Sequence, residues 1–493
     1  MKSLKIFCIA LSSTLIVGGC SKFIDYDPVE DYQITADLFF TSSADYQKAV
    51  IATYSPLQWL WANVVIGDVA TDNSVTGGEN ATDQIGFQQI DDYTHNPINN
   101  YLEEAWKSCF EGINRANWLE ENKEKLQFSG KDALYGEVYF LRAYYYFELV
   151  RFFGDVPLFT ERRLTVSDSR SLQRTPKAEV YKQIEKDLNA AITALPATNP
   201  QKGRITKHAA QALLGKVLLY QGKFDAAATT LESVIAGPFS LVPDFGSIFL
   251  QNGENGPESV FEIQYSNLSP FFDWSNPGRG QGNLAVQVTG IRNITGTSPY
   301  GQGWSTNLPT KNLADAYKTG DRRKAVTILD IEAYKTANPQ FNITYLTAPF
   351  KNTGLYNQKY SPRKGETSGQ VELNYLNNFR TIRFADVLLM AAEANNRKAT
   401  PDATKAQTYL NTVRRRAFGN NNNDITLTST LLTEAIWEER RLEFAMEGDR
   451  FFDLVRTGKA ASRITGFVVG KNEVFPIPQN EIDVSGLAQN PGY

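Results

Sequence analysis

The sequence predicts a mainly α-helical protein, in which pairs of helices form a tetratricopeptide-like scaffold beside a loop-rich, irregular region. Apolar residues recur every three or four positions in several long segments, which is the period of a helix with one buried face. Between these segments lie two stretches that are rich in turn-forming residues and have no helical period. The chain has 493 residues, enough to bury a large core.

The first twenty residues, MKSLKIFCIALSSTLIVGGC, have the pattern of a bacterial secretion signal. Two lysines precede the short apolar run 6–17, which is too short to span a bilayer, and two glycines precede Cys20. Small residues before a cysteine resemble a lipobox. We therefore expect a signal peptide over 1–19, a lipid on Cys20 and a single domain over 20–493; an ordinary signal peptide with an incidental cysteine is the alternative.

The helical segments fall into two groups, at about 131–236 and 380–450. In the first group we expect helices at 131–153 and 177–195, followed by a helix pair at 207–236. The spacing of Gly215, Gly222 and Ala227 matches the tetratricopeptide pattern, in which small residues let two helices approach and a glycine closes the turn. The second group contains a pair at 380–417 and a helix at about 431–446.

The stretches 67–100 and 251–310 are expected to form the loop-rich ligand region. The second of them contains 9 Gly, 5 Pro and 7 Asn, with only 6 charged residues, so no helix is expected there. It also contains 7 aromatic residues, which argues against disorder. A long loop of this kind inside a folded protein is typical of a functional segment.

One short motif occurs twice. The segments 147–151 and 452–456 share the pattern F-[DE]-L-V-R, with an acid three residues before an arginine. On a helix this spacing forms a weak ion pair. We interpret the motif as stabilising a helix face and the docking of a helix end, not as a catalytic feature.

Composition excludes several classes of function. The formal net charge of −4 provides no basic surface for nucleic acid, and two histidines are too few for a His-rich zinc site. No phosphate-binding loop, dinucleotide fingerprint or nucleophile motif is present. The acids of 438–450 could suggest acid–base chemistry, but Arg440 and Arg441 are expected to neutralise them. We expect no catalytic residues, no metal and no cofactor; calcium would be possible, although no EF-hand spacing occurs.

Several segments in order resemble the SusD/RagB family of outer-membrane nutrient-binding lipoproteins. They are the lipobox at Cys20, FLRAYYYFELVRFFGDVPL at 140–158, GWSTNLPTKNLADAY at 303–317, IRFADVLLMAAEA at 382–394, LNTVRRRA at 410–417, EERRLEFAMEGDRFFDLVRTGK at 438–459 and the closing segment 474–493. The resemblance implies non-catalytic capture of oligosaccharides, or of peptides in some members. It also implies delivery to a TonB-dependent SusC-type transporter, and a lipid-anchored position at the outer membrane that faces the cell surface.

Sugars have apolar C–H faces and many hydroxyl groups, so a capture site needs flat aromatic rings beside polar side chains on turn-rich loops. The primary candidates for glycan contact are Trp274, Tyr300, Trp304 and Asp72. Packing is the competing role for Trp304, which lies in a segment that the resemblance covers, and turn formation is the competing role for Asp72. Secondary candidates surround them: Phe271, Phe272, Arg279, Asn283, Arg292, Asp68, Asn73, Asn80, Asp83 and, more weakly, Arg380. The remaining tryptophans, Trp59, Trp61, Trp106, Trp118 and Trp437, lie in or beside helical patterns and are expected in the core.

Two other functions remain open at this point. The first is a lipoprotein scaffold whose tetratricopeptide repeats bind a peptide or an assembly partner. The aromatic stretch 251–310 argues against it, because a pure scaffold has no use for such a segment. The second is a secreted carbohydrate-active enzyme, which would need two carboxylates facing each other across a cleft.

Overall fold

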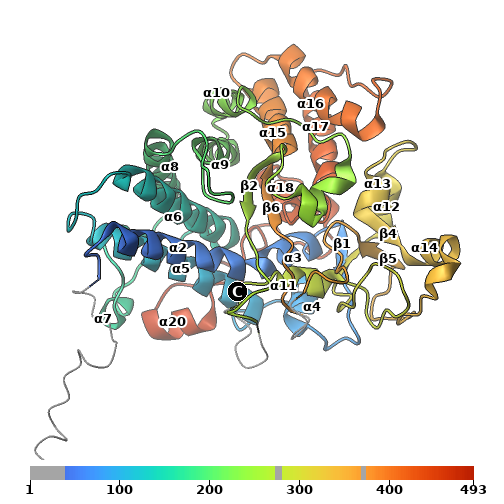
Figure 1. The fold of residues 1–493 in the computed structure, drawn as a ribbon, viewed down its shortest axis with the longest axis horizontal. Helices are drawn as coiled ribbons and strands as arrows, with labels where there is room; N and C mark the ends of the chain where they lie inside the picture. The colour runs from blue at the N-terminus through green and yellow to red at the C-terminus, as the bar shows by residue number, and fades with distance from the viewer. Residues whose placement is uncertain (1–38, 273–279, 368–372) are drawn as a thin grey trace, which may run out of the picture.

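The computed structural model describes residues 39–272, 280–367 and 373–493. Within these ranges the protein is mainly α-helical, which confirms the predicted fold class. Its scaffold is a row of long helices in which each helix packs against the next, and Figure 1 shows this row running from the blue helices to the orange ones. These helices are α2 (Ser43–Trp59), α5 (Asn100–Glu121), α6 (Lys131–Phe153), α8 (Lys177–Ala194), α9 (Lys207–Tyr220), α10 (Phe224–Ile235), α15 (Phe384–Arg397), α16 (Ala403–Phe418) and α17 (Ser429–Glu443).

The predicted helices are confirmed, with two corrections at their ends. The segment expected to begin a helix at 380 is first a strand, β6 (Phe379–Arg383), because its backbone pairs antiparallel with β2 (Ser259–Ile263). The helix expected to reach 446 ends at Glu443, and the chain then turns through Met446 and Gly448, both of which have positive φ. None of the described helices combines the length and apolar character that crossing a bilayer requires.

The α9–α10 pair shows why small residues occur at the predicted positions. A Cβ atom added at Gly215 would lie 2.4 Å from Cδ2 of Leu231, so the two helices can only be this close with glycine there. Gly222 adopts φ +71° in the turn between them, a conformation that glycine adopts without strain. Ala227 is completely buried.

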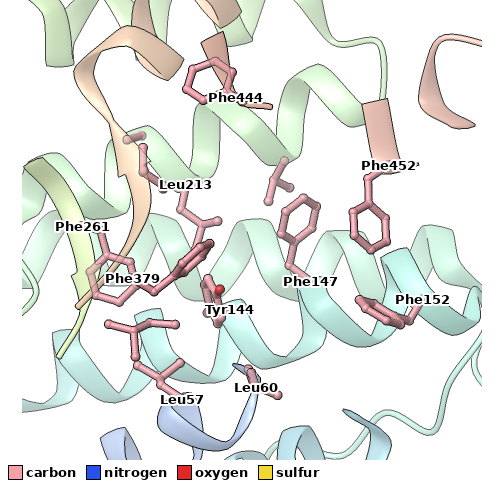
Figure 2. Packing of buried hydrophobic residues seen from close by; sticks show 14 of the residues in the cluster. Leu57, Leu60, Tyr144, Phe147, Phe152, Leu213, Phe261, Phe379, Phe444 and Phe452 are labelled. Atoms are coloured by element: carbon pink, nitrogen blue, oxygen red, sulfur yellow. The ribbon is translucent and has the colours of Figure 1, made fainter. Parts of the chain in front are cut away.

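The largest core cluster joins the helix row to the irregular half of the molecule. Figure 2 shows Tyr144 and Phe147 of α6 beside Leu57 of α2, Phe261 of β2 and Phe379 of β6. The sequence predicted a single apolar stripe on α6, but the helix is buried on nearly all sides. Its buried charges are paired; Arg142, for example, donates two hydrogen bonds of 2.8 Å to Asp187 of α8.

The irregular half consists of short elements and three two-stranded antiparallel sheets. The sheets pair β1 (Ser74–Thr76) with β3 (Asn307–Pro309), β2 with β6, and β4 (Ile328–Asp330) with β5 (Leu355–Asn357). The short helices are α3 (Trp61–Val69), α4 (Ile85–Asp91), α7 (Val166–Ser169), α11 (Leu284–Thr289), α12 (Lys311–Ala316), α13 (Lys324–Thr327), α14 (Ile331–Ala337), α18 (Arg450–Arg456), α19 (Ala460–Arg463) and α20 (Gln479–Ser485). The stretch 251–310 therefore contains β2, α11 and β3, which its composition did not predict.

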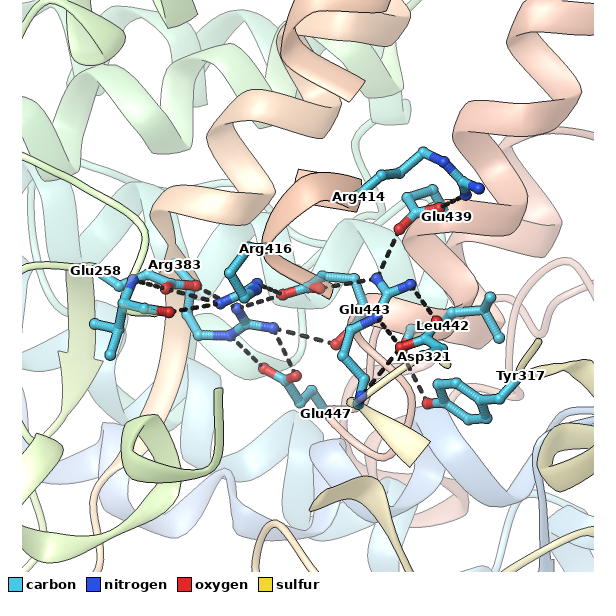
Figure 3. A network of polar contacts seen from close by, with 12 residues as sticks. Glu258, Tyr317, Asp321, Arg383, Arg414, Arg416, Glu439, Leu442, Glu443 and Glu447 are labelled. Carbon is cyan, nitrogen blue, oxygen red and sulfur yellow. Dashed lines mark hydrogen bonds and ion pairs between the residues drawn. The ribbon is translucent and has the colours of Figure 1, made fainter. Parts of the chain in front are cut away.

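A buried ionic network links the two halves (Figure 3). Arg383, at the end of β6, binds Glu258 at 2.7 Å, Glu443 at 2.9 Å and Glu447 at 2.8 Å. Arg323 binds Asp321 at 2.7 Å and two glutamates of α17. Removing one member of such a network leaves a buried charge without its partner, which is strongly destabilising.

The same network corrects the expected partners of the acidic segment 438–450. Arg440 pairs with Asp386 and Asp453 instead of neutralising the glutamates of its own helix. Arg441 does pair with Glu438 of its own helix, at 3.4 Å, as expected. The other three glutamates, Glu439, Glu443 and Glu447, are bound by cations from other segments of the chain, so they serve the fold.

Candidate functional site

Three loops of the irregular half meet around Trp304. They are the loop 77–84 after β1, the segment 290–306 between α11 and β3, and the segment 344–350. The amide of Leu346 donates to the carbonyl of Arg292 at 3.1 Å, and the amide of Phe350 donates to the carbonyl of Gly78 at 2.8 Å. Backbone hydrogen bonds thus hold three distant parts of the sequence side by side.

The backbone at Trp304 is fixed from both sides. Its amide donates to the carbonyl of Gln287 at 2.9 Å, and the amide of Ser305 donates to the carbonyl of Gly290 at 2.7 Å. A Cβ added at Gly303 would lie 2.2 Å from Cα of Gly290, so the two segments touch through glycines. The indole ring is therefore carried on a stiff support, although it lies in a loop.

Arg292 organises the polar groups beside the backbone of Trp304. Its guanidinium donates to the carbonyl of Trp304 at 3.0 Å, forms an ion pair with Asp83 and lies 3.5 Å from the carboxylate of Glu79. Asp83 also accepts a 2.9 Å hydrogen bond from the amide of Glu79, which closes the loop 79–83. A guanidinium with two carboxylates offers donors and acceptors in a fixed geometry.

We call this group of five residues the Trp304 surface: Glu79, Asn80, Asp83, Arg292 and Trp304. The side chain of Glu79 is 67% exposed and that of Arg292 is 15% exposed, while Asn80 is exposed and Trp304 is partly buried. The group combines charge-paired hydrogen-bonding side chains with a partly buried aromatic residue whose ring packs against the largest core cluster. A polyhydroxylated ligand needs both kinds of group.

Four of these five residues are among the candidates predicted from the sequence, and Glu79 is not. Trp304 was a primary candidate, and Asn80, Asp83 and Arg292 were secondary ones. Glu79 lies within Gly77-Gly78-Glu79-Asn80, so an acid between turn formers was the available signal. The contact with Arg292, 213 positions away along the chain, is what makes it part of the site.

Asp72 lies in a different environment from Trp304. Its carboxylate accepts two 2.9 Å hydrogen bonds from Arg450 and lies 3.2 Å from Arg441. Burial alone would raise the pKa of Asp72, but the hydrogen bonds and charges of these two arginines hold it below its ordinary value. The side chain is 10% exposed, so a role in glycan contact stays a prediction while its structural partners are clear.

Tyr300 is also largely enclosed. The residue is 5% exposed and belongs to a small core cluster, where its ring meets that of Tyr334 edge-on at 5.4 Å. Burial raises the pKa of Tyr300 to about 12, so the phenol stays neutral at physiological pH. Glycan contact through this ring remains a prediction that would require the surrounding segment to open.

Most of the other predicted residues lie in the core or in the part of the chain that is not described, and Phe271 is partly buried. Phe272, Asn283, Asp68, Asn73 and Arg380 are buried. Trp59, Trp61 and Trp106 are buried as predicted, and Trp118 and Trp437 are partly buried. Trp274, Arg279 and Cys20 lie outside the described residues.

The described residues also contain no cluster of three or more histidine, cysteine, aspartate or glutamate side chains with the geometry to hold a metal ion. Cys109 is buried as a free thiol, and burial raises its pKa well above the ordinary value. A buried, neutral thiol is inert, so it contributes packing only.

Comparison with known proteins gives two family matches. A model described as "SusD family" matches residues 346–493. A second, described as "Starch-binding associating with outer membrane", matches residues 24–219. Among curated proteins, "SusD-like protein P2" of Formosa agariphila is 28% identical over an alignment that covers all of both chains.

Solved structures are similar over nearly the whole chain. A "laminarin binding SusD-like protein" has a TM-score of 0.83 and 34% identity, and the match covers 92% of this chain and all of that one. A surface glycan-binding protein A from Bacteroides thetaiotaomicron, in complex with laminarihexaose, has a TM-score of 0.80 and 28% identity, covering 91% of this chain and all of that one.

Proposed function

This chain belongs to the SusD family, and from that premise we propose that it captures oligosaccharides on its loop-rich face and delivers them, unaltered, to a TonB-dependent transporter of the SusC type. The observation that carries the proposal is the Trp304 surface. There Arg292, paired with Asp83 and Glu79, donates to the backbone carbonyl of Trp304, whose side chain is partly buried on a rigid backbone. Aromatic stacking holds the apolar face of a sugar ring, and the polar groups bind its hydroxyls.

The ligand class follows from charge and from the relatives. Arg292 is paired with two carboxylates, so the surface presents no net positive charge that would select an anionic sugar. The relatives described above are named for binding laminarin or laminarihexaose, which are neutral glucans. We therefore expect a neutral glucan, with laminarihexaose as the first ligand to test.

The protein is a binding protein and not an enzyme, as its solved relatives are named for glycan binding. The carboxylates of Asp83 and Glu79 are charge partners of Arg292 in this structure. Delivery without chemistry needs nothing more than reversible binding.

Attachment to the outer membrane belongs to the same proposal. The family description of the match at 24–219 refers to association with the outer membrane. A lipid on Cys20, after removal of residues 1–19, would supply the anchor and leave the folded part at the cell surface, next to the transporter. Stable anchoring takes more than one acyl chain, as bacterial lipoproteins have.

Calorimetry with laminarihexaose tests the proposal through Trp304. We expect Trp304→Ala to weaken binding at least tenfold, which corresponds to about 1.4 kcal/mol, because the stacking face is lost. Trp304→Phe keeps a ring and is expected to retain most of the affinity. Glu179→Ala, an exposed acid on α8, serves as a control that should bind like the wild type.

The result is decisive in both directions. If Trp304→Ala is folded by circular dichroism and its affinity is unchanged, the Trp304 surface does not bind the glycan. Release of new reducing ends from laminarihexaose by the purified wild type would show an enzyme instead of a binding protein.

A further inference from the structure

A pocket of about 500 Å³ lies between long helices of the scaffold and α18, and it shares no residue with the Trp304 surface. It forms where the end of α6, the start of α8, the end of α9, α18 and the segment 473–474 meet. Its volume falls within the range of roughly 300–1,000 Å³ that is usual for small-molecule sites. Nothing in the proposed capture of glycans at Trp304 uses this pocket.

The repeated F-[DE]-L-V-R motif builds the pocket. The valine and arginine of each copy, Val150 with Arg151 and Val455 with Arg456, line it together. Each arginine binds the acid three residues before it, which confirms the predicted helical pairs. Both guanidinium groups lie over the ring of Tyr220, at 6.0 Å for Arg151 and 5.5 Å for Arg456. The two copies of the motif thus hold one tyrosine between them.

The charges around the pocket are compensated. Arg151 is paired with Glu148 and lies 3.4 Å from Asp449. Arg456 binds both carboxylate oxygens of Glu393 at 2.9 Å and Asp453 at 2.7 Å. Each arginine therefore has two acidic partners. These groups carry no net positive charge together, so they would not select an anionic ligand. At the rim, Lys177 and Glu473 have opposite charges.

The walls combine flat rings with unused hydrogen-bonding capacity. Tyr181 and Tyr220 are partly buried and Phe452 is buried, while Gln221 adds an amide at the rim. Among the described residues no hydrogen-bond partner reaches the Arg151 Nε or the Tyr220 hydroxyl, and both atoms are buried. Each such atom is free to accept or donate a hydrogen bond to a bound molecule.

From these features we infer a second binding site, for a short, uncharged saccharide of two or three rings. The ring of Tyr181 would contact the C–H faces, because guanidinium groups already lie over the rings of Tyr220 and Phe452. Gln221, Lys177 and Glu473 would bind hydroxyls at the rim. The class of ligand in this inference rests on the proposed function, whereas the position of the site rests on the pocket itself. A protein with two such sites holds a long glycan at two separated points, which raises its avidity.

Titration calorimetry with laminarihexaose and, in parallel, maltohexaose tests the second site. Ala178 is an exposed lining residue at the start of α8, so Ala178→Trp fills the pocket without removing a buried group. Asn189→Trp places the same side chain on an exposed position of the same helix, away from the pocket, as a matched control. Trp304→Ala removes the other site.

We expect the wild type and Asn189→Trp to bind two equivalents of saccharide, and Ala178→Trp to bind one. Trp304→Ala should retain one equivalent. In that variant, fluorine NMR of protein labelled with 3-fluorotyrosine should show resonances that shift on adding saccharide, and Tyr181→Phe and Tyr220→Phe should each remove one of them. This readout does not depend on how stable Ala178→Trp is.

The two proposals fail in different ways. A single equivalent in the wild type that disappears in Trp304→Ala would overturn the second site and leave the proposed function intact. Binding that survives in Trp304→Ala but is lost in Ala178→Trp would place capture in the helical pocket and overturn the role of Trp304. Binding of neither saccharide by the wild type would overturn both.

Discussion

Asp72 illustrates how a polar side chain in a turn-rich stretch can serve the fold. Asp72 lies in the turn-rich stretch 67–100, where Asp and Asn are typical both of turn formation and of hydroxyl recognition. The sequence therefore predicted that Asp72 binds hydroxyls. In the structure its carboxylate is held by Arg450 and Arg441, which lie more than 360 positions away. No local sequence pattern contains that information, because it depends on a contact between segments that are distant in the sequence.

Asp72→Asn is expected to destabilise the protein by about 3 kcal/mol at pH 7, because two largely buried arginines lose their charged partner. The pKa of Asp72 is lowered in the folded state, so its contribution is present above the ordinary carboxyl pKa of about 4 and is lost as the pH falls through the lower folded value. Urea unfolding of wild type and variant at pH 7 and pH 3 measures this, and the difference should shrink at pH 3.

The same variant tests whether Asp72 contacts glycan. If the variant is as stable as the wild type but binds laminarihexaose more weakly, the carboxylate belongs to the ligand site and its pairing with Arg450 is secondary. Reduced stability with unchanged affinity supports the structural role.

At the scale of elements, the long helices were predictable and the short ones were not. The helices α6, α8, α9 and α10 follow from apolar periodicity, turn glycines and capping residues that lie within each segment. By contrast, α11 and β3 lie in a glycine-rich stretch, and they form because backbone partners such as β1 and the segment 290–306 are supplied by tertiary structure. Strand pairing between residues more than 200 positions apart leaves no periodic signal.

Gly215→Ala tests the close approach of α9 and α10. The added methyl group would lie 2.4 Å from a methyl carbon of the buried Leu231, so we expect a loss of about 1–3 kcal/mol in the free energy of unfolding. Gly246→Ala is the control, because its new methyl group would meet neighbours at an ordinary 3.4 Å. The measurement is urea unfolding followed by circular dichroism.

A double variant gives the specific readout for this contact. If Gly215→Ala clashes with Leu231, then adding Leu231→Val should restore part of the stability, and the two effects should not be additive. Strict additivity would show that the glycine is required for another reason, such as the backbone conformation of α9.

At the scale of the whole molecule, the sequence resemblance anticipated the architecture because its motifs mark the contacts between the two halves. The segment 438–459 supplies the glutamates of the buried ionic network, and 303–317 contains Trp304 together with β3. The resemblance could not specify the Trp304 surface, because its polar residues come from loops whose contacts are made in three dimensions. Side chains such as Glu79 acquire their role from Arg292 alone.

Membrane attachment gives a prediction for the complete chain. Cys20→Ser should leave the protein folded but release it from the membrane fraction, because the thiol that would carry the lipid is gone. Cys8→Ser, within the predicted signal peptide, is the matched control and should remain attached. Membrane fractionation with immunodetection measures both, and attachment of Cys20→Ser would contradict a lipid anchor at this position.

A crystal structure of the wild-type protein grown with laminarihexaose tests the central claim most directly. We expect density for an unbroken hexasaccharide, with one glucose ring stacked on the indole of Trp304 and hydroxyls bound by Arg292 and its neighbouring carboxylates. A well-occupied saccharide that leaves the Trp304 surface empty, or density for a shortened product at that surface, would contradict it.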